Sequence, residues 1–299
     1  MLLALICGTL ALTAPQQVDT TMNVGRGQRL DVNAYGGEVT VRAWNRNAIR
    51  VEASTSDRER VELSSSATAV SVRTQGRHGP PDNIELRITA PPWMALTLSG
   101  VNTSVKVEGI RAPITVETVE GEVDVTGGEG LVSLRSVQGS VTLRGARGRI
   151  NVNSVNEDVE VAGSSGEVVA QTVNGEITIQ VVDAPSVDAS TVNGDISYSG
   201  PIRAGGRYDL TTHNGDITLT VPEGTSAGVA VSTFSGEFES EFPVPLRNTR
   251  KGKGFSFTLG SGSAQVTLES FQGTIQLVRP GSERDPARRH RDDRDHEED

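Results

Sequence analysis

Residue types that carry chemistry are scarce in this sequence. One cysteine, Cys7, and four histidines occur among its 299 residues. Cys7 lies inside an apolar N-terminal stretch of the kind that is removed on export, so we expect a mature chain without a thiol. A disulfide framework and thiolate chemistry are therefore excluded. The stability of the fold must come from packing and hydrogen bonding instead.

Lysines and aromatic residues are also few. Three lysines (Lys106, Lys251 and Lys253) accompany 25 arginines, and the 38 acidic residues give a net charge of −10. An acidic chain of this kind is poorly suited to nucleic acid or to an anionic membrane surface. Aromatic residues make up 4% of the chain and are almost absent from the columns that we expect to face outward. This scarcity weakens the case for sugar rings stacking on the protein.

Long apolar runs and catalytic motifs are missing too. The apolar stretch 1–14 (MLLALICGTLALTA) is too short to span a bilayer, and we interpret residues 1–16 as a signal peptide. No P-loop, GxSxG, HExxH or dinucleotide-binding fingerprint occurs in the sequence. We therefore predict an exported protein, in the periplasm, at the cell surface or outside the cell, with no membrane span and no enzymatic activity.

A repeated phrase is what the sequence does contain, seen most plainly as Val-Asn-Gly-Glu-Ile-Thr-Ile at 173–179. Aligned on its glycine, it recurs in steps of 18, 18, 18, 18, 19, 21, 21 and 37 residues. The aligned positions are Thr103, Gly121, Gly139, Glu157, Gly175, Gly194, Gly215, Gly236 and Gly273. Such a period is typical of a solenoid, in which each unit buries its apolar face against the next.

Every repeat carries the same pattern of side chains. Apolar residues stand seven and five positions before the glycine and two and four after it, as Val168, Ala170, Ile177 and Ile179 do. A hydroxyl residue stands three before the glycine, and a further apolar residue, here Val173, stands two before it. Alternation with β-branched residues predicts short strands, and no long segment has a helical period, so the class is all-β. We expect the column of Val173 to face the interior.

Two arrangements of strands agree with this pattern, a parallel β-helix and an antiparallel meander. The Asn-Gly step lets the backbone adopt positive φ and is a strong hairpin signal. A hairpin on Asn174-Gly175 would pair Val173 with Glu176, and the same apolar–acidic mismatch would recur in most repeats. Equal repeat lengths favour a coil, because successive turns must match to keep their hydrogen bonds in register. We predict a parallel β-helix with short coils of about 18–21 residues.

The pattern divides the chain into four parts. We predict a signal peptide over 1–16, an N-terminal β cap with the first β unit over 22–95, β-helix repeats over 96–279 and a disordered charged tail over 280–299. The first unit, 30–41, places Tyr35 in the column of Val173. All six phenylalanines fall between 234 and 271, where we expect them to fill a broadened terminal section of the coil.

Polar columns on either side of the glycine supply the candidate site residues. The residue after the glycine is mostly acidic, and carboxylates stacked one rung apart would stand about 5 Å from each other, near the separation in retaining glycosidases. Glu176, Asp195 and Asp216 could form such a pair or a ladder that binds Ca²⁺, but a solvated column left by duplication is the simpler interpretation. The amides before the glycine, such as Asn174, should form a structural ladder. His213 stands in an apolar column and is predicted to be a packed core histidine.

Several segments together resemble a known family. Beside the repeated phrase they are the lead-in TAPPWMAL at 89–96, Val-Pro-Glu-Gly at 221–224 and Ser-Phe-Gln-Gly-Thr-Ile at 270–275. Over roughly residues 28–279 the chain resembles the DUF4097 adhesin-like proteins of bacteria. The resemblance implies a β-helix of the cell envelope or a secreted one, adhesin-like in role, with no catalytic residues to transfer.

Two functions follow from these observations. The first is a non-enzymatic, exported β-solenoid that acts as an interaction or structural module of the envelope, contacting an unknown protein or glycan through its long face or the basic loop 243–254. The alternative is a polysaccharide-active lyase or hydrolase that uses the carboxylate column. A lyase would need a basic residue beside its aspartates, and the outward columns near Glu176, Asp195 and Asp216 contain no Lys or Arg. We therefore favour the non-enzymatic function, without a cofactor.

Overall fold

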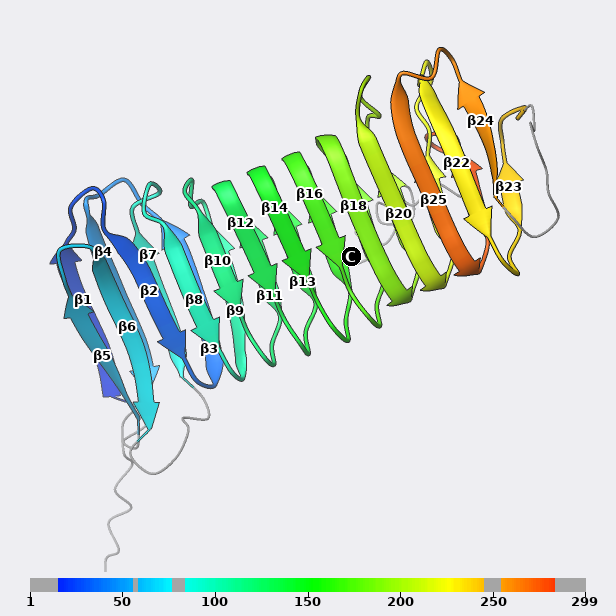
Figure 1. Ribbon diagram of the computed structural model, residues 1–299. Helices are drawn as coiled ribbons and strands as arrows, with labels where there is room; N and C mark the ends of the chain where they lie inside the picture. The colour runs from blue at the N-terminus through cyan, green and yellow to red at the C-terminus, as the bar shows by residue number, and fades with distance from the viewer. Residues whose placement is uncertain (1–15, 56–58, 77–83, 245–253, 283–299) are drawn as a thin grey trace, which may run out of the picture.

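A computed structural model describes residues 16–55, 59–76, 84–244 and 254–282 of the chain. Within these ranges the chain forms 26 β-strands and no helix. The strands stack into one elongated coil (Figure 1). Nearly all of the predicted signal peptide, most of the basic loop 243–254 and residues 283–299 of the predicted tail lie outside the described residues.

Two sheets, each of 13 strands, form the two long sides of the coil. From the N-terminal end of the rod, sheet A consists of β1 (Gln16–Asn23), β4 (Ala48–Thr55), β7 (Glu85–Ala90), β3 (Gly37–Ala43), β9 (Thr103–Glu108), β11 (Val123–Thr126), β13 (Val141–Arg144), β15 (Val159–Ala162), β17 (Ile177–Gln180), β19 (Ile196–Ser199), β21 (Ile217–Thr220), β26 (Ile275–Val278) and β23 (Phe238–Ser240). From the same end, sheet B consists of β5 (Glu59–Ser65), β6 (Ala69–Gly76), β2 (Arg29–Ala34), β8 (Leu96–Gly100), β10 (Ile114–Glu117), β12 (Glu129–Arg135), β14 (Arg147–Asn153), β16 (Ser165–Gln171), β18 (Asp183–Asn193), β20 (Arg207–Asn214), β25 (Ala264–Gln272), β22 (Ala227–Thr233) and β24 (Phe255–Leu259).

Each turn of the coil, here called a rung, contributes one strand to each sheet. In the central rung, β16 runs to the corner at Asn174-Gly175, and the chain returns as β17. Successive rungs pair in parallel, with Ile150 beside Val168 in sheet B and Val159 beside Ile177 in sheet A. The prediction of a parallel β-helix is confirmed, and the antiparallel meander is excluded for the repeats.

Small apolar side chains fill the interior of the coil in stacked columns. The residues seven and five before the glycine, and two and four after it, are buried as the alternation predicts. Val168 is 1% exposed, and Ala170, Ile177 and Ile179 are fully buried. Because the same residue types recur at the same height in every rung, each side chain packs on its equivalents above and below.

The position before each corner differs from the prediction. Val173 is 41% exposed, whereas its neighbour Thr172 is 5% exposed. The alternation that turns Val168 inward continues as far as Thr172, so the hydroxyl points into the coil and the valine points to solvent. The prediction that the column of Val173 faces the interior, with Tyr35 and His213 in it, is therefore wrong.

Hydrogen bonds between rungs satisfy the buried hydroxyls. Thr172 donates its Oγ1 hydrogen to the carbonyl oxygen of Glu157 at 3.0 Å, and Thr212 donates to that of Gly194 at 2.9 Å. Equivalent bonds are donated by Thr118, Ser136, Ser154, Thr191 and Ser270. A buried hydroxyl is tolerated when it is bonded in this way, and each bond ties one corner to the preceding rung.

The corner glycines are required because neighbouring rungs nearly touch there. A Cβ at Gly194 would lie 1.9 Å from the carbonyl oxygen of Gly175, and a Cβ at Gly215 would lie 2.0 Å from that of Gly194. On the backbone as it stands, a Cβ at either position overlaps that carbonyl oxygen, although two other rungs hold Thr103 and Glu157 at the equivalent position. Positive φ does not explain the asparagines, because Val181 is the only non-glycine residue of the described chain with positive φ.

Antiparallel strands close both ends of the rod. At the N-terminal end β1 pairs with β4, β4 with β7 and β5 with β6, all antiparallel. At the other end β24 pairs antiparallel with β22. Strands β4, β5, β6 and β7 lie within 22–95, the region predicted as cap and first β unit, whereas most of β1 precedes it. The antiparallel strands end the parallel stack at this end of the rod.

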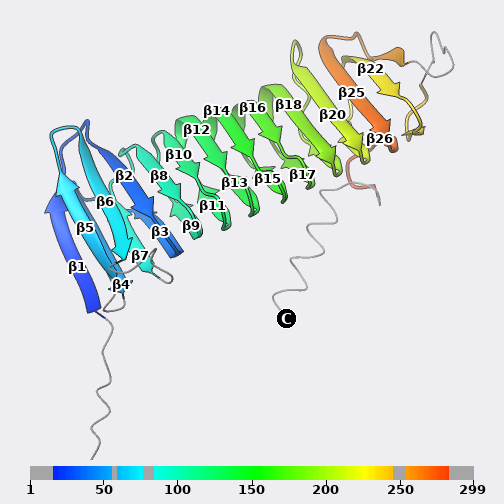
Figure 2. The same ribbon diagram turned by 60° about the horizontal axis from the view of Figure 1, so that its bottom comes forward.

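The rungs at the C-terminal end do not follow chain order. Strand β25 lies between β20 and β22, and β26 lies between β21 and β23 (Figure 2). The last rung of the sequence is therefore inserted beneath the one that precedes it. The 37-residue step reflects this insertion rather than a broadened coil. Phe257 is 4% exposed and packs in the core, but Phe234 is 69% exposed, so the aromatic residues fill the terminal section only in part.

Candidate interaction surface

The residues two before each corner glycine form a continuous line along one edge of the rod. We call this line the corner ridge. From the N-terminal end it consists of Tyr35, Val101, Val119, Val137, Val155, Val173, Val192, His213, Phe271 and Phe234. It follows the edge at which the sheet B arrows β10 to β18 end in Figure 1. Ten positions with a spacing of about 4.8 Å span on the order of 40 Å.

Backbone hydrogen bonds hold the central valines of the corner ridge in register. The carbonyl oxygen of Val155 accepts from the N–H of Asn174, and that of Val173 accepts from the N–H of Asn193, both at 2.8 Å. The exposed valines, from Val101 to Val192, are 41–45% exposed. The ridge is therefore an ordered row of half-exposed apolar side chains on a backbone whose carbonyls are already bonded.

The C-terminal end of the corner ridge is aromatic. The rings of His213 and Phe271 stack with centroids 4.6 Å apart, and those of Phe271 and Phe234 stack at 4.7 Å, with planes within 11° of parallel. Because the rings stack along the rod, Phe271 in the middle is covered on both faces, whereas Phe234 at the end has one stacked neighbour and is 69% exposed. His213 is exposed in this stack, which corrects the prediction of a core histidine.

A ladder of side-chain amides runs beside the ridge, as the sequence predicts. Asn174 donates its Nδ2 hydrogen to Oδ1 of Asn156 at 3.1 Å. Asn193 donates to Asn174, and Asn214 donates to Asn193, both at 2.8 Å. Each amide thus bonds to its equivalents on neighbouring rungs, so its role is to hold the stack together.

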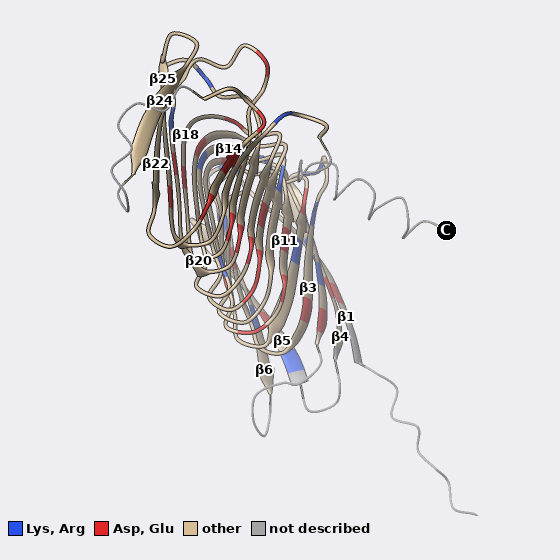
Figure 3. Cartoon of the chain, turned by 90° about the vertical axis from the view of Figure 1, so that its right-hand side faces the viewer, with Lys and Arg blue, Asp and Glu red and all other residues tan. Residues whose placement is uncertain are grey.

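Carboxylates form a second flank of the ridge. Within three residues after each ridge residue the sequence contains nine acidic residues and no Lys or Arg. We call them the acidic band: Glu38, Glu120, Glu122, Glu157, Asp158, Glu176, Asp195, Asp216 and Glu237. No ion pair joins any of the nine to a residue of the described chain. Viewed from the end of the rod, acidic segments recur on successive rungs (Figure 3).

The aspartates of the acidic band also accept backbone hydrogen bonds. Asp195 Oδ1 accepts from the N–H of Asp216 at 2.8 Å, and Asp216 Oδ1 accepts from the N–H of Thr274 at 2.6 Å. The structure thus places Glu176, Asp195 and Asp216 on neighbouring rungs, with the two aspartates acting as structural acceptors. Among the described residues no three His, Cys, Asp or Glu side chains are grouped as metal ligands. The solvated column stays the prediction, with Ca²⁺ binding as its untested alternative.

The family of the chain follows from a direct comparison. A family model described as Toastrack DUF4097 matches residues 27–278. The chain belongs to the Toastrack DUF4097 family. The resemblance seen in the repeated phrase is thereby confirmed. No curated protein matches this Toastrack chain.

Three solved structures are weakly similar to this Toastrack chain. A "putative adhesin" from Bacteroides fragilis is 13% identical, with a TM-score of 0.44 over 89% of this chain and 99% of that one. A "putative adhesin" from Parabacteroides distasonis is 11% identical, with a TM-score of 0.37 over 89% and 98% of the two chains. A "putative lipid binding protein" from the same species is 10% identical, with a TM-score of 0.34 over 88% and 96%. No helix in the described part of the Toastrack chain is long and apolar enough to cross a membrane.

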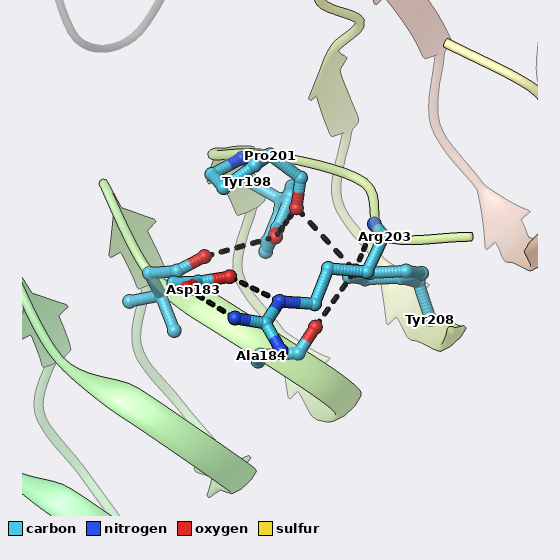
Figure 4. Close-up of polar contacts among 7 residues, drawn as sticks. Asp183, Ala184, Tyr198, Pro201, Arg203 and Tyr208 are labelled. Carbon is cyan, nitrogen blue, oxygen red and sulfur yellow. Dashed lines mark hydrogen bonds and ion pairs between the residues drawn. The ribbon is translucent and has the colours of Figure 1, made fainter. Parts of the chain in front are cut away.

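Figure 4 shows a polar cluster that the sequence did not reveal, at the opposite corner of the coil between β19 and β20. The hydroxyl of Tyr198 donates to the carbonyl oxygen of Pro201 at 3.1 Å. The hydroxyl of Tyr208 donates to the carbonyl oxygen of Ala184 at 2.8 Å and accepts the N–H of Arg203 at 2.9 Å. The sequence feature that could have indicated this cluster is the presence of two tyrosines, Tyr198 and Tyr208, in columns of the repeat that otherwise contain aliphatic residues.

Burial sets the protonation of this cluster. It raises the pKa of both Tyr198 and Tyr208, so both hydroxyls remain protonated donors near neutral pH. The guanidinium of Arg203 hydrogen-bonds to Asp183 and holds the pKa of that carboxyl below its usual value. The two rings meet edge to face with centroids 5.5 Å apart. This arrangement holds the seven-residue connection 200–206 against the rod and serves structure rather than catalysis.

Proposed function

We propose that this Toastrack chain is an exported, non-enzymatic β-solenoid that acts as an interaction module of the bacterial cell envelope. The corner ridge is the observation that carries the proposal. An apolar line on the order of 40 Å long stays exposed on a rod whose interior is already filled. Extended apolar surfaces of soluble proteins commonly mark contact sites for a partner. The partner is a protein or a glycan of the envelope.

The contacts of the carboxylate column support a binding role over catalysis. An enzyme needs one distinctive acid–base pair, whereas here each aspartate repeats the same bond to the next rung. These carboxylates also lie on a convex corner beside the ridge, where a substrate would not be shielded from water. Hydrogen bonds that repeat from rung to rung in this way stabilise the stack.

Binding is tested with the purified chain immobilised without residues 1–16 and exposed to solubilised bacterial envelope material. We expect saturable retention of a defined component, identified by cross-linking and mass spectrometry. Equal retention on a heat-unfolded sample, or no saturation, would contradict the proposal. Export is tested by cell fractionation, where full-length uncleaved protein in the cytosol would contradict it.

The enzymatic alternative is tested with a panel of acidic and neutral polysaccharides, with and without Ca²⁺. We expect neither new reducing ends nor unsaturated products absorbing in the ultraviolet. Turnover by the wild-type chain that is lost in Asp195→Ala, while Thr211→Ala on the neighbouring rung retains it, would overturn the non-enzymatic proposal.

A further inference from the structure

We propose that the corner ridge and the acidic band together bind a basic amphipathic helix of a protein partner. The inference deepens the proposed function and rests on it. The apolar face of the helix would lie along the ridge, and its Lys and Arg residues would face the carboxylates. Four properties of the corner ridge and the acidic band favour such a helix. They are the hydrogen bonding of the ridge backbone, the negative charge of the band, the stacking of the ridge's aromatic rings and the length of the ridge.

Backbone bonding excludes an added β-strand along the ridge. The ridge carbonyls accept hydrogen bonds from the next rung, as Val119 does from Gln138 at 2.8 Å and Val173 does from Asn193 at 2.8 Å. Strand addition needs free carbonyl oxygens on the receiving edge, and those of the ridge are already used. A partner must therefore dock through its side chains. A helix does so, because its own backbone groups are bonded internally.

Charge selects a basic partner. The acidic band places nine carboxylates beside the ridge with no Lys or Arg among them. The other flank of the ridge is formed by the residues two positions before each ridge residue. Among these, two are acidic, Glu117 and Glu269, and one is basic, Arg135. Such an edge attracts cationic groups and repels anionic ones. A second copy of this acidic chain, or an anionic lipid surface, would bring like charges together along the whole ridge.

Ring orientation disfavours a glycan on the aromatic end. Sugars pack against the faces of aromatic rings, but both faces of Phe271 are covered, by His213 at 4.6 Å and Phe234 at 4.7 Å, and Phe271 covers one face of each of these two rings. The exposed ring edges and the valine methyl groups suit aliphatic side chains instead. Phe234, which is 69% exposed, offers the largest apolar surface of the ridge and would anchor one end of the helix.

Length sets the size of the partner. A helix rises about 1.5 Å per residue, so roughly 27 residues cover a ridge on the order of 40 Å. A helix with an apolar stripe and basic flanks of this length can contact the whole ridge. Shorter helices should bind in proportion to the ridge they cover, beginning at the aromatic end.

A synthetic peptide tests the inference. A fluorescein-labelled helix of about 28 residues, with leucines on one face and lysines on both flanks, is titrated with the wild-type chain by fluorescence anisotropy. We expect saturable binding that weakens as salt rises. The triple variant Val173→Ser/Val192→Ser/Phe271→Ser should bind at least about tenfold more weakly. Glu120→Gln/Glu122→Gln/Glu176→Gln, which keeps the aspartate acceptors, should bind more weakly and with a smaller salt dependence.

Matched controls decide the outcome. Leu131→Ser removes an apolar side chain that is 44% exposed but lies off the ridge, and should change the affinity by less than about twofold. The inference is wrong if the ridge variant binds as tightly as wild type, or if a scrambled peptide of the same composition binds equally. It is also wrong if a glutamate version of the peptide binds better, or if sedimentation shows a dimer that the ridge variant abolishes. All variants are first checked for an unchanged circular dichroism spectrum.

The same variants separate this inference from the function on which it rests. If an envelope component binds wild type and the ridge variant equally, the ridge is not the contact and the interaction function stands. If neither the wild-type chain nor the ridge variant binds any envelope component saturably, both this inference and the proposed interaction function are wrong.

Discussion

At the corner glycines, the backbones of neighbouring rungs approach so closely that a single Cβ decides whether they can stack. The Cβ of an alanine at Gly194 would meet the Gly175 carbonyl oxygen at 1.9 Å, whereas nothing lies within 4 Å of a Cβ at Gly145. We therefore expect Gly194→Ala to lower the free energy of unfolding by about 3 kcal/mol or more.

Gly145→Ala serves as the control for this prediction. Gly145 has a φ of 70°, so alanine there is strained but not blocked, and should cost only about 1 kcal/mol. Urea unfolding of both variants, followed by circular dichroism, measures the difference. Equal losses would mean that backbone angle, and not contact between rungs, explains the corner glycines.

Val181 is a residue whose backbone conformation does not suit its side chain. It has a φ of 51°, close to the 70° of Gly145 and the 56° of Gly163, which take the equivalent corner in other rungs. Its side chain is 69% exposed and contributes little packing. Glycine removes the strain of the left-handed conformation in the folded state but also adds conformational entropy to the unfolded chain. The first free-energy effect is the larger, so Val181→Gly should raise the free energy of unfolding by about 0.5–1 kcal/mol.

Thermal melting of Val181→Gly beside Val169→Gly measures this effect. Val169 lies within strand β16, where glycine weakens a strand, so that variant should melt below wild type. A lower melting temperature for Val181→Gly as well would contradict the proposed strain.

The corner ridge shows where reasoning from single residues succeeds and where it fails. Its apolar side chain alone predicts that Val173 lies inside, and nothing about the polar side chain of Thr172 alone predicts burial. Strict alternation from Val168 would have placed Thr172 inside, since it is an even number of residues away. What the sequence could not show is the acceptor for that hydroxyl, the Glu157 carbonyl of the preceding rung, because this pairing exists only after the rungs stack.

At the scale of elements, the connection between β19 and β20 depends on two buried tyrosines. Burial raises the pKa of Tyr198 and Tyr208 above the usual value of 10.0. A folded-state pKa above the unfolded value stabilises the fold below that unfolded value, and the stability is lost as pH rises through the folded-state pKa. We therefore expect the titration of these two groups to leave stability unchanged near neutral pH and to lower it above about pH 10.

Urea unfolding from pH 8 to pH 11.5 measures this dependence. Tyr198→Phe/Tyr208→Phe should be less stable than wild type at pH 8, because the hydroxyl bonds to Pro201 and Ala184 are lost, but should lose less stability on going to high pH. Tyr35→Phe, an exposed tyrosine, is the control and should keep the wild-type profile. Identical alkaline losses in wild type and the double variant would refute the role of the buried pair.

The repeated strands were predictable as elements because each rung obeys the same local pattern. The alternation of apolar and polar residues predicts the strands, and the repeated glycine predicts the corner. The equal lengths of the repeats predict that successive rungs pair in parallel register. The amide ladder from Asn156 to Asn214 follows from the same repetition. The tyrosine cluster was not predictable, since its hydroxyls bond to the backbone carbonyls of Val182, Ala184 and Pro201, which come from two separate segments of the chain.

For the whole molecule, the order of rungs is the feature that sequence could not supply. Strands β22 and β25 carry nearly the same pattern, so either could have followed β20. The structure places β25 there, with Val266 between Tyr208 and Val229. The choice depends on which arrangement lets β24 close the end of the stack, and that is a property of the assembled rod rather than of any one repeat.

This order makes a prediction about how the end of the rod unfolds. Val266 and Val229 are each 2% exposed, and they stand side by side in β25 and β22. Because β25 lies between β20 and β22, Val266→Ala should speed amide hydrogen exchange in both neighbours. Val229→Ala, the same change one rung further out, should affect β22, β24 and β25 but leave β20 near its wild-type protection. If the rungs followed chain order instead, Val229→Ala would be the variant that exposes β20, so exchange in that strand, measured by mass spectrometry, distinguishes the two arrangements.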